Sequence, residues 1–328
     1  MIHIAIFGAG RIGRVHAQHA VEHPEITLSY VVDPVTEHAA ALAARTGATV
    51  ATAEQVFADP SIDGVIVASS TTSHAALVQR AARAGKAVFC EKPLSLDYAT
   101  AEACVTVLNR LQTRCLMGFH RRYDRHFRAV RDRIKTGHAG KVYQVVVFSR
   151  SGAIPPIEYV QVSGGLFRDS SIHDLDMIRY LLGEEIATIY AVGGCRADEA
   201  IGAAGDIDTA MITLVSRSGV LAQINNARHT PFGYDQRVEV LASKALLRVE
   251  NVTQDSLVVG AENGFTSAKP MNSFLDRYAA AYRAEMDAFL ALITKGVAPL
   301  ADQNDGLEAQ RLAEAAYRSL EDGKAISL

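Results

Sequence analysis

The residues best suited to chemistry in this sequence stand on one predicted helix, near residues 169 to 182. At about 100° per residue, Asp169, His173 and Asp176 fall on one face of that helix. A histidine can accept a hydroxyl proton near neutral pH, and a neighbouring carboxylate can orient its ring and stabilise the imidazolium. Two other interpretations stay open from the residues alone. Asp169 and His173 could be zinc ligands, or Asp169 or Ser170 could only cap the helix.

A lysine at the end of a predicted strand is the second candidate. Lys92 lies in the sequence Cys90-Glu91-Lys92-Pro93, where an apolar run ends. In an open α/β sheet, ligands bind outside the carboxyl ends of the strands, so Lys92 is placed to reach a bound ligand. Its ammonium can hydrogen-bond a substrate hydroxyl and stabilise negative charge that develops on the oxygen. From the spacing alone, a surface lysine is an equal alternative.

Three glycines near the N-terminus predict a dinucleotide site. Gly8, Gly10 and Gly13 have the GxGxxG spacing between an apolar run and a helical pattern that starts near Gly10. Arg11 and Ile12, between the second and third glycines, are further predicted cofactor contacts. Such glycines make a tight turn, let the backbone approach a pyrophosphate and let helix and strand pack closely. The N-terminus of the following helix attracts the phosphates. The alternative is a glycine-rich turn in an ordinary α/β domain.

An acidic residue indicates which dinucleotide binds. Asp33 stands 20 residues after Gly13, at the end of the second apolar run. A carboxylate there accepts hydrogen bonds from ribose hydroxyls and repels a 2′-phosphate. Pro34, Val35 and Thr36 follow it, so no arginine is at hand to neutralise such a phosphate. The sequence therefore predicts NAD rather than NADP.

The order of apolar patterns predicts the fold class. Strand and helix patterns alternate to about residue 119, which indicates an α/β Rossmann domain with a doubly wound parallel sheet. Successive strands over 186–268 indicate a C-terminal α+β domain with a large open, mostly antiparallel sheet. A loop is expected at 151–165, and helices are expected at 274–295 and 304–322. We expect an NAD-binding domain at 1–120 and a substrate-binding and oligomerisation domain at 121–328.

Composition limits the partners and the compartment. The net charge of −3 predicts no general affinity for nucleic acid or for an anionic membrane, and no apolar run approaches the about 20 residues that span a bilayer. The first strand begins at once, so no signal peptide is expected. The four cysteines form no CxxC pair and suggest no metal site, and a reducing cytoplasm fits them. One face of the open sheet needs a cover, which a partner subunit can provide.

Several segments resemble the Gfo/Idh/MocA oxidoreductase family over essentially the whole chain, and the later ones are similar to its inositol-dehydrogenase branch. These segments are the GAGRIG start, SSTTSH (69–74), CEKPLSLD (90–97), MGFHRRYD (117–124), SGGLFRDSSIHDLDM (163–177) and FGYDQRVEV (232–240). The resemblance implies NAD-dependent oxidation of a secondary alcohol on a cyclic polyol to a ketone, with myo-inositol first among the substrates. It also implies a homotetramer.

The same resemblance implies roles for individual residues. The catalytic set is Lys92, Asp169 and His173. Further cofactor contacts fall on Ser70, Thr71, His74, Glu91 and Lys92. Substrate contacts fall on Lys92, Arg121, Ser151, Asp169, His173, Asp176 and Tyr234.

Some positions depart from the family pattern, all of them near the expected substrate pocket. Relatives usually carry Asp or Asn where this chain has Ser151, so a group that could hold a sugar hydroxyl is missing. The segment after it, Ser170-Ser171 and His120 differ as well. Three alternatives therefore stay open: a same-family enzyme for another sugar, anhydrosugar or inositol isomer; an NAD-binding regulator without activity; and a secreted oxidoreductase that holds NADP permanently.

Overall fold

The computed structural model describes residues 1–328 and divides them into two units. The first unit contains Met1–Tyr123 and Ala280–Gln310, and the second contains Asp124–Ala279 and Arg311–Leu328. The sequence suggested one boundary near residue 120, with everything after it in one domain. The chain instead returns to the first unit at residues 280–310.

A parallel sheet forms the centre of the first unit, as the alternating pattern predicted. Its strand order is β3-β2-β1-β4-β5-β6, and its neighbouring strands are all parallel. The direction of winding changes between β1 and β4, which is the usual ligand position in such sheets. The strands are β1 (Ile2–Phe7), β2 (Ile26–Val32), β3 (Thr49–Val50), β4 (Gly64–Val67), β5 (Ala87–Glu91) and β6 (Cys115–Gly118).

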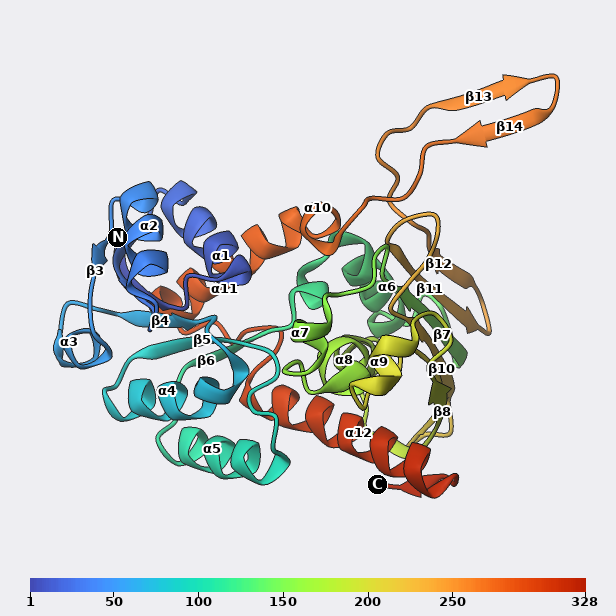
Figure 1. Cartoon of the computed structure of the whole chain (residues 1–328). Helices are drawn as coiled ribbons and strands as arrows, with labels where there is room; N and C mark the ends of the chain where they lie inside the picture. The colour runs from blue at the N-terminus through green and yellow to red at the C-terminus, as the bar shows by residue number, and fades with distance from the viewer. The chain divides into compact units, whose positions relative to one another are not determined.

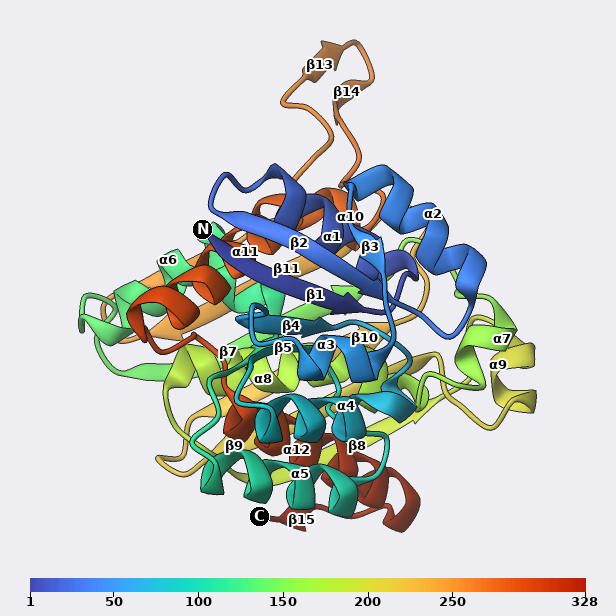
Figure 2. The same cartoon turned by 90° about the vertical axis from the view of Figure 1, so that its left-hand side faces the viewer.

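Helices cover both faces of this sheet, which explains why β4, β5 and β6 are buried along their whole length. Figures 1 and 2 show α1, α2 and α11 on one face and α4 and α5 on the other. The helical elements are α1 (Arg11–Glu22), α2 (Thr36–Thr46), α3 (Ala53–Ala58), α4 (Thr71–Arg83), α5 (Tyr98–Arg110), the 3₁₀ turn η1 (His120–Tyr123), α11 (Ala279–Lys295) and the start of α12 (Gln303–Asp322).

The second unit is built on a seven-stranded sheet of order β12-β11-β7-β10-β9-β8-β15. Only β7 and β10 pair in parallel, so the predicted mostly antiparallel sheet is confirmed. Buried and exposed residues alternate along β9, as expected for a sheet with one open face. The strands are β7 (Val142–Arg150), β8 (Ile186–Gly194), β9 (Thr209–Ser216), β10 (Leu221–Ala227), β11 (Asp235–Ala242), β12 (Leu246–Val249) and β15 (Ile326–Ser327).

The helices of the second unit depart from the expected pattern in three places. A short helix, α7, interrupts the predicted loop at 151–165. The helix with Asp169 begins two residues early, in a π-helical turn. The predicted helix at 274–295 is broken at Tyr278 into α10 and α11. The elements are α6 (Arg125–Lys135), α7 (Ile157–Val160), the π turn η2 (Phe167–Ser171), α8 (Ile172–Leu182), α9 (Glu199–Ala203) and α10 (Phe274–Arg277).

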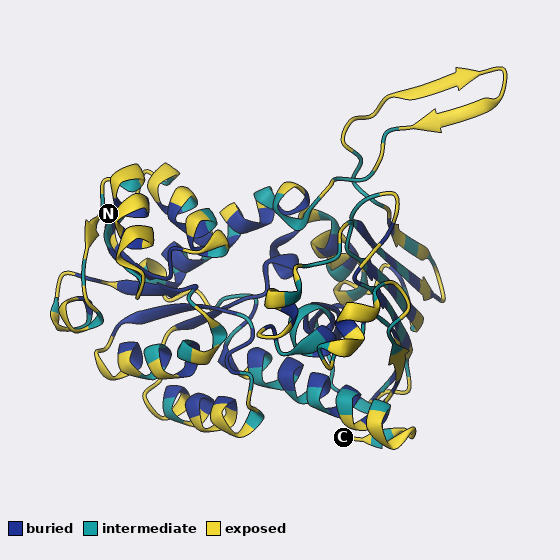
Figure 3. Ribbon diagram, in the orientation of Figure 1, coloured by how far each residue is buried: buried dark blue, intermediate teal, exposed yellow.

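A hairpin of β13 (Val258–Ala261) and β14 (Gly264–Ser267) extends from the second unit, and every residue of both strands is exposed (Figure 3). Among the helices, none combines the length and the apolar character needed to cross a membrane.

Candidate active site

The three glycines of the N-terminal turn have different surroundings. Gly8 has φ +104°, and a Cβ added to it would stand 2.5 Å from the carbonyl oxygen of Ala68. A Cβ on Gly13 would stand 1.9 Å from the carbonyl oxygen of Gly8. A Cβ on Gly10 would meet nothing within 4 Å. Gly8 and Gly13 are therefore required by packing, whereas Gly10 keeps a space clear at the start of α1, as the approach of a pyrophosphate requires.

Donors for an anion are present beside that space. Gly10 is the N-cap of α1, no side chain caps the helix, and its first turn contains no acidic residue. The N–H groups in the first turn of a helix have no intrahelical partner, so the start of α1 is suited to receive an anion. Arg11 and Ile12, which the sequence assigned to the cofactor, are the first two residues of this helix.

Asp33 joins the end of β2 to the glycine turn. Its Oδ2 accepts a hydrogen bond of 2.7 Å from the N–H of Ala9, and its Oδ1 accepts one of 2.9 Å from the N–H of Val35. The carboxylate is half-buried, so it keeps an exposed edge toward solvent. This geometry fits a carboxylate that holds the adenosine ribose of NAD.

The start of α4 carries the other predicted cofactor residues of this unit. Ser70 is the N-cap, and Thr71 is the first helical residue. His74 is buried, with Nδ1 2.8 Å from the carbonyl oxygen of Pro93 and Nε2 3.1 Å from that of Ser69. Burial lowers the pKa of His74. The imidazole thus ties the end of β4 to the residue after Lys92, a supporting position beneath the predicted contacts.

Lys92 follows β5 directly, and its peptide bond to Pro93 is cis. Its backbone N–H donates to Oε2 of Glu91 at 3.2 Å, while Oε1 of Glu91 lies 2.7 Å from Nε2 of His16. His16 is fully buried. Sequence reasoning missed this histidine, although its place on α1, three residues after Gly13, put it on the face that packs against the sheet.

Asp169 in the second unit does not cap its helix. The helical backbone is already formed at Phe167, and the carboxylate makes other contacts. Its Oδ1 accepts a 2.7 Å hydrogen bond from the hydroxyl of Tyr159, and its Oδ2 accepts a 3.2 Å bond from Nη1 of Arg228. A π-helical turn at this position is frequent at functional sites. The sequence offered no signal for Tyr159 or Arg228 as partners of Asp169.

The rest of this helix is buried on the predicted face. His173 and Asp176 are both buried, and Asp176 lies 3.9 Å from Nη1 of Arg179. Asp174, on the neighbouring face, accepts a 2.8 Å hydrogen bond from the amide of Asn226. The helix therefore presents His173 with carboxylates on both sides along the chain.

The remaining predicted substrate residues divide between the units. Arg121 is a buried residue of η1. It belongs to the first unit, and so does Lys92. Ser151 and Tyr234 belong to the second unit, where their backbone N–H groups donate to Ala227 and Met271. Sequence reasoning predicted site residues at strand ends and on one helix. The protein groups that contact Asp169 come from distant parts of the chain.

These features define a class of protein: a dinucleotide-binding α/β domain joined to a second unit with an acid–histidine helix. The chain belongs to the Gfo/Idh/MocA oxidoreductase family. Residues 2–119 match the family's NAD-binding Rossmann fold, and residues 131–328 match its C-terminal alpha/beta domain. The protein is accordingly an NAD-dependent oxidoreductase by family.

Several relatives of this chain are named as inositol dehydrogenases. Inositol 2-dehydrogenase of Rhizobium meliloti (strain 1021) is 41% identical over 327 residues, which cover 100% of this chain and 99% of the relative. The crystal structure of a myo-inositol dehydrogenase from Corynebacterium glutamicum ATCC 13032 has a TM-score of 0.96 at 36% identity, with 100% and 99% covered. A scyllo-inositol dehydrogenase from Lactobacillus casei with bound NAD(H) and scyllo-inositol has a TM-score of 0.92 at 27% identity, with 100% and 99% covered.

Proposed function

We propose that this protein oxidises a secondary alcohol of a cyclic polyol to a ketone with NAD as the electron acceptor, and that myo-inositol is its leading substrate. The observation that carries the proposal is the acid–histidine helix, in which Asp169 is held by two donors one turn before His173. The names of the relatives support the substrate class. Lys92, Asp169 and His173 form the proposed catalytic set.

Each of these residues has a distinct role in the proposal. His173 accepts the proton of the reacting hydroxyl, and Asp169 orients the imidazole and balances its positive charge. Lys92 donates a hydrogen bond to the reacting oxygen and stabilises its developing negative charge. Bound NAD supplies the acceptor for the hydride that leaves the same carbon. The proton and the hydride together account for the two hydrogens lost by the alcohol.

The cofactor is held, in this proposal, by the glycine turn and the start of α4. Gly8, Gly10, Arg11, Ile12 and Gly13 receive the pyrophosphate, and Asp33 holds the adenosine ribose. The remaining proposed contacts are Ser70, Thr71, His74, Glu91 and Lys92. Because His74 and Glu91 are buried and bonded to neighbouring protein groups, their contribution includes support of the residues around them.

The exact polyol depends on the side chains that bind the non-reacting hydroxyls. Arg121, Ser151, Asp176 and Tyr234 are the proposed contacts besides the catalytic set. A buried polar group rejects a substrate that leaves it unpaired, so such contacts discriminate between isomers. The short hydroxyl of Ser151 keeps one alternative in view: a same-family dehydrogenase for another inositol isomer, sugar or anhydrosugar. The scyllo-inositol bound by a structural neighbour favours an isomer among these.

The test is a panel of inositol isomers, sugars and anhydrosugars, each assayed with NAD and with NADP. We expect the highest kcat/KM with myo-inositol and NAD. We also expect His173→Ala to lower kcat by about a hundredfold or more, which is the range for loss of a general base. His138→Ala is the matched control because His138 is exposed on the same unit. If tight NADH binding occurs without turnover of any panel member, the protein is a regulator and the proposal is wrong.

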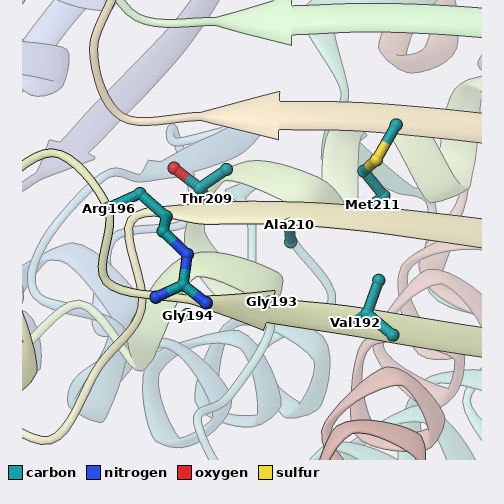
Figure 4. A pocket seen from close by; sticks show the side chains of 7 residues that line it. All are labelled: Val192, Gly193, Gly194, Arg196, Thr209, Ala210 and Met211. Carbon is teal, nitrogen blue, oxygen red and sulfur yellow. The ribbon is translucent and has the colours of Figure 1, made fainter.

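We further propose a cytoplasmic homotetramer in which the open face of the second unit's sheet is covered by another copy. Large apolar side chains are exposed on this sheet: Tyr143, Tyr190, Val192, Met211, Leu221, Leu241 and Leu246. Figure 4 displays a shallow hollow on β8 and β9, where Gly193 and Gly194 lie between Val192 and Arg196 and no proposed catalytic residue takes part. The four cysteines are free thiols, as a reducing compartment permits.

The mass of the native particle tests this assembly. We expect Met211→Glu to convert the tetramer to smaller species because it places a charge on the proposed contact face. Val21→Glu is the control, since Val21 is as exposed as Met211 but lies on α1. A wild-type monomer in native mass spectrometry would contradict the proposal.

A further inference from the structure

Arg228 is an arginine in the interior of the second unit, placed immediately after β10. Its side chain is 3% exposed, and its backbone N–H donates to the carbonyl of Asp208 at 2.8 Å. Burial of a guanidinium is costly unless anions and hydrogen bonds compensate it. The groups that compensate the charge of Arg228 therefore indicate what this residue does.

Two carboxylates share this guanidinium. Nη1 of Arg228 donates to Oδ2 of Asp169 at 3.2 Å, and Nη2 donates to Oδ2 of Asp206 at 3.0 Å. Both carboxylates are largely buried, with side chains 12% and 6% exposed. One positive charge thus stands between two negative charges, and the three groups together carry one net negative charge. Burial opposes the charged form of Arg228, yet the two carboxylates raise its pKa.

The contacts also restrict how Asp169 can turn. Tyr159 donates to its Oδ1 and Arg228 donates to its Oδ2, so each oxygen has a donor from a different part of the chain. Asp206 is fixed as well, because its Oδ1 accepts a 3.0 Å bond from the N–H of Leu166. Asp169, one turn before His173, is therefore held by its own helical backbone, by the hydroxyl of Tyr159 and by the guanidinium of Arg228.

We propose that Arg228 is a positioning residue that holds Asp169 ionised and in one orientation, and that Asp206 sets how strongly it does so. Through Asp169, this pair sets the basicity of His173. The inference rests on the proposed function in treating His173 as the base, but its physical content concerns only the second unit.

The other charged groups around this cluster do not replace Arg228. Arg168, next to Asp169 in sequence, makes a double contact of 2.6 Å with the carboxylate of Glu314. Tyr317, beside Asp206, has its pKa raised to about 12, first by burial and then by the charge of Asp206. It stays neutral over the working range of a histidine. Arg228, by contrast, contacts Asp169 directly.

Changes to the two partners of Asp169 have opposite signs. An ionised carboxylate near an imidazole raises the pKa of the imidazole, and a nearby cation lowers it. Arg228→Gln removes a positive charge that contacts Asp169, so we expect the pKa of His173 to rise. In Asp206→Asn, Arg228 has one charged partner instead of two, so its field on Asp169 and His173 is stronger and the pKa of His173 should fall. The asparagine oxygen can still accept from Leu166.

The experiment is a histidine titration by NMR in the full-length protein, with the His173 signal assigned by its loss in His173→Gln. We expect the pKa of His173 to rise by about half a unit or more in Arg228→Gln and to fall in Asp206→Asn. Arg228→Lys keeps the charge, so it should restore most of the wild-type value. Arg277→Gln is the control, because Arg277 forms an equally buried ion pair with Asp124 in the same unit.

The outcomes separate the inference from the proposed function. Shifts in the same direction in Arg228→Gln and Asp206→Asn, or no shift in either, would overturn the role of Arg228. If Arg228→Gln does not fold, Asp206→Asn and Arg228→Lys decide the question by themselves. The titration needs no turnover, so failure of every substrate in the panel would overturn the proposed function and leave this measurement valid. With an active enzyme, the acid limb of kcat/KM should move with the pKa of His173.

Discussion

His16 and Glu91 face each other in the interior of the first unit, with 2.7 Å between the imidazole Nε2 and the carboxylate Oε1. The His16 ring packs edge-on against Phe89 and Tyr282. Glu285 on α11 is fully buried, and neither of its carboxyl oxygens has a hydrogen-bond partner in the chain. Burial and then the charge of Glu91 raise the pKa of Glu285 well above its usual value. Glu285 therefore keeps its proton at pH values where a free glutamate loses it.

This buried acid makes a prediction about stability and pH. The folded state keeps the proton of Glu285 while the unfolded state releases it above the ordinary glutamate pKa, so the free energy of unfolding falls as the pH rises. Glu285→Gln has no proton to lose, so its decline should be shallower by up to about 1.4 kcal/mol per pH unit. Urea unfolding between pH 5 and 8 measures the slope. Glu102→Gln, at an exposed site on α5, should keep the wild-type slope.

The glycines of the turn should respond differently to the same substitution. Gly13→Ala places a Cβ 1.9 Å from a carbonyl oxygen and should lower the free energy of unfolding by about 2 kcal/mol or more. Gly10→Ala meets no protein atom within 4 Å, so its stability should stay close to wild type. Its affinity for NAD should nevertheless fall at least tenfold, because the methyl group occupies the space proposed for the pyrophosphate. Isothermal titration calorimetry measures this affinity. Equal losses of stability in both variants would contradict this division.

Asp33 should govern the choice between the two dinucleotides. In Asp33→Asn, the negative charge that repels a 2′-phosphate is gone, and one of the bonds to Ala9 or Val35 loses its acceptor. We expect affinity for NADH to fall by about tenfold or more, as is typical for loss of a charged hydrogen bond, while affinity for NADPH does not fall. Calorimetric titration with both reduced cofactors gives the ratio. An unchanged ratio would remove Asp33 from the selection of NAD.

Asp208 should make the second unit sensitive to acid. Burial by itself would raise its pKa, but hydrogen bonds from the backbone N–H of Asp198, the hydroxyl of Thr209 and the N–H groups of Arg196 and Ala197 lower it to about 2. The stabilisation is present above the ordinary aspartate pKa and is lost as the pH falls toward 2. Asp208→Asn should therefore lower the free energy of unfolding by about 2 kcal/mol at pH 7.

The acid dependence distinguishes this explanation from a general packing defect. Below pH 4, wild type should approach the stability of Asp208→Asn, because protonation removes the same charge. Asp132→Asn, at an exposed position on α6, should show neither effect. A constant difference between wild type and Asp208→Asn from pH 7 to pH 2.5 would mean that the charge is not the cause.

Local patterns in the sequence were sufficient for the elements and for part of the site. Apolar runs of strand length and the GxGxxG spacing predicted the parallel sheet and its glycine turn, because period and turn chemistry act over a few neighbouring residues. The same reasoning placed Asp169 and His173 on one helix. It failed at the π turn and at the break near Tyr278, where contacts from other segments alter a regular helical pattern.

The tertiary structure alone decided which charged groups lie next to one another and which positions have free space around them. Three glycines that look equivalent in the sequence became two packing glycines and one open position. Arg228 contacts Asp169 although they are 59 residues apart in the sequence, and His16 contacts Glu91 although they are 75 residues apart. The sequence determines which residue types and periodicities are present. Electrostatic and steric effects depend on separations of a few ångströms, and only the folded chain brings such distant residues that close.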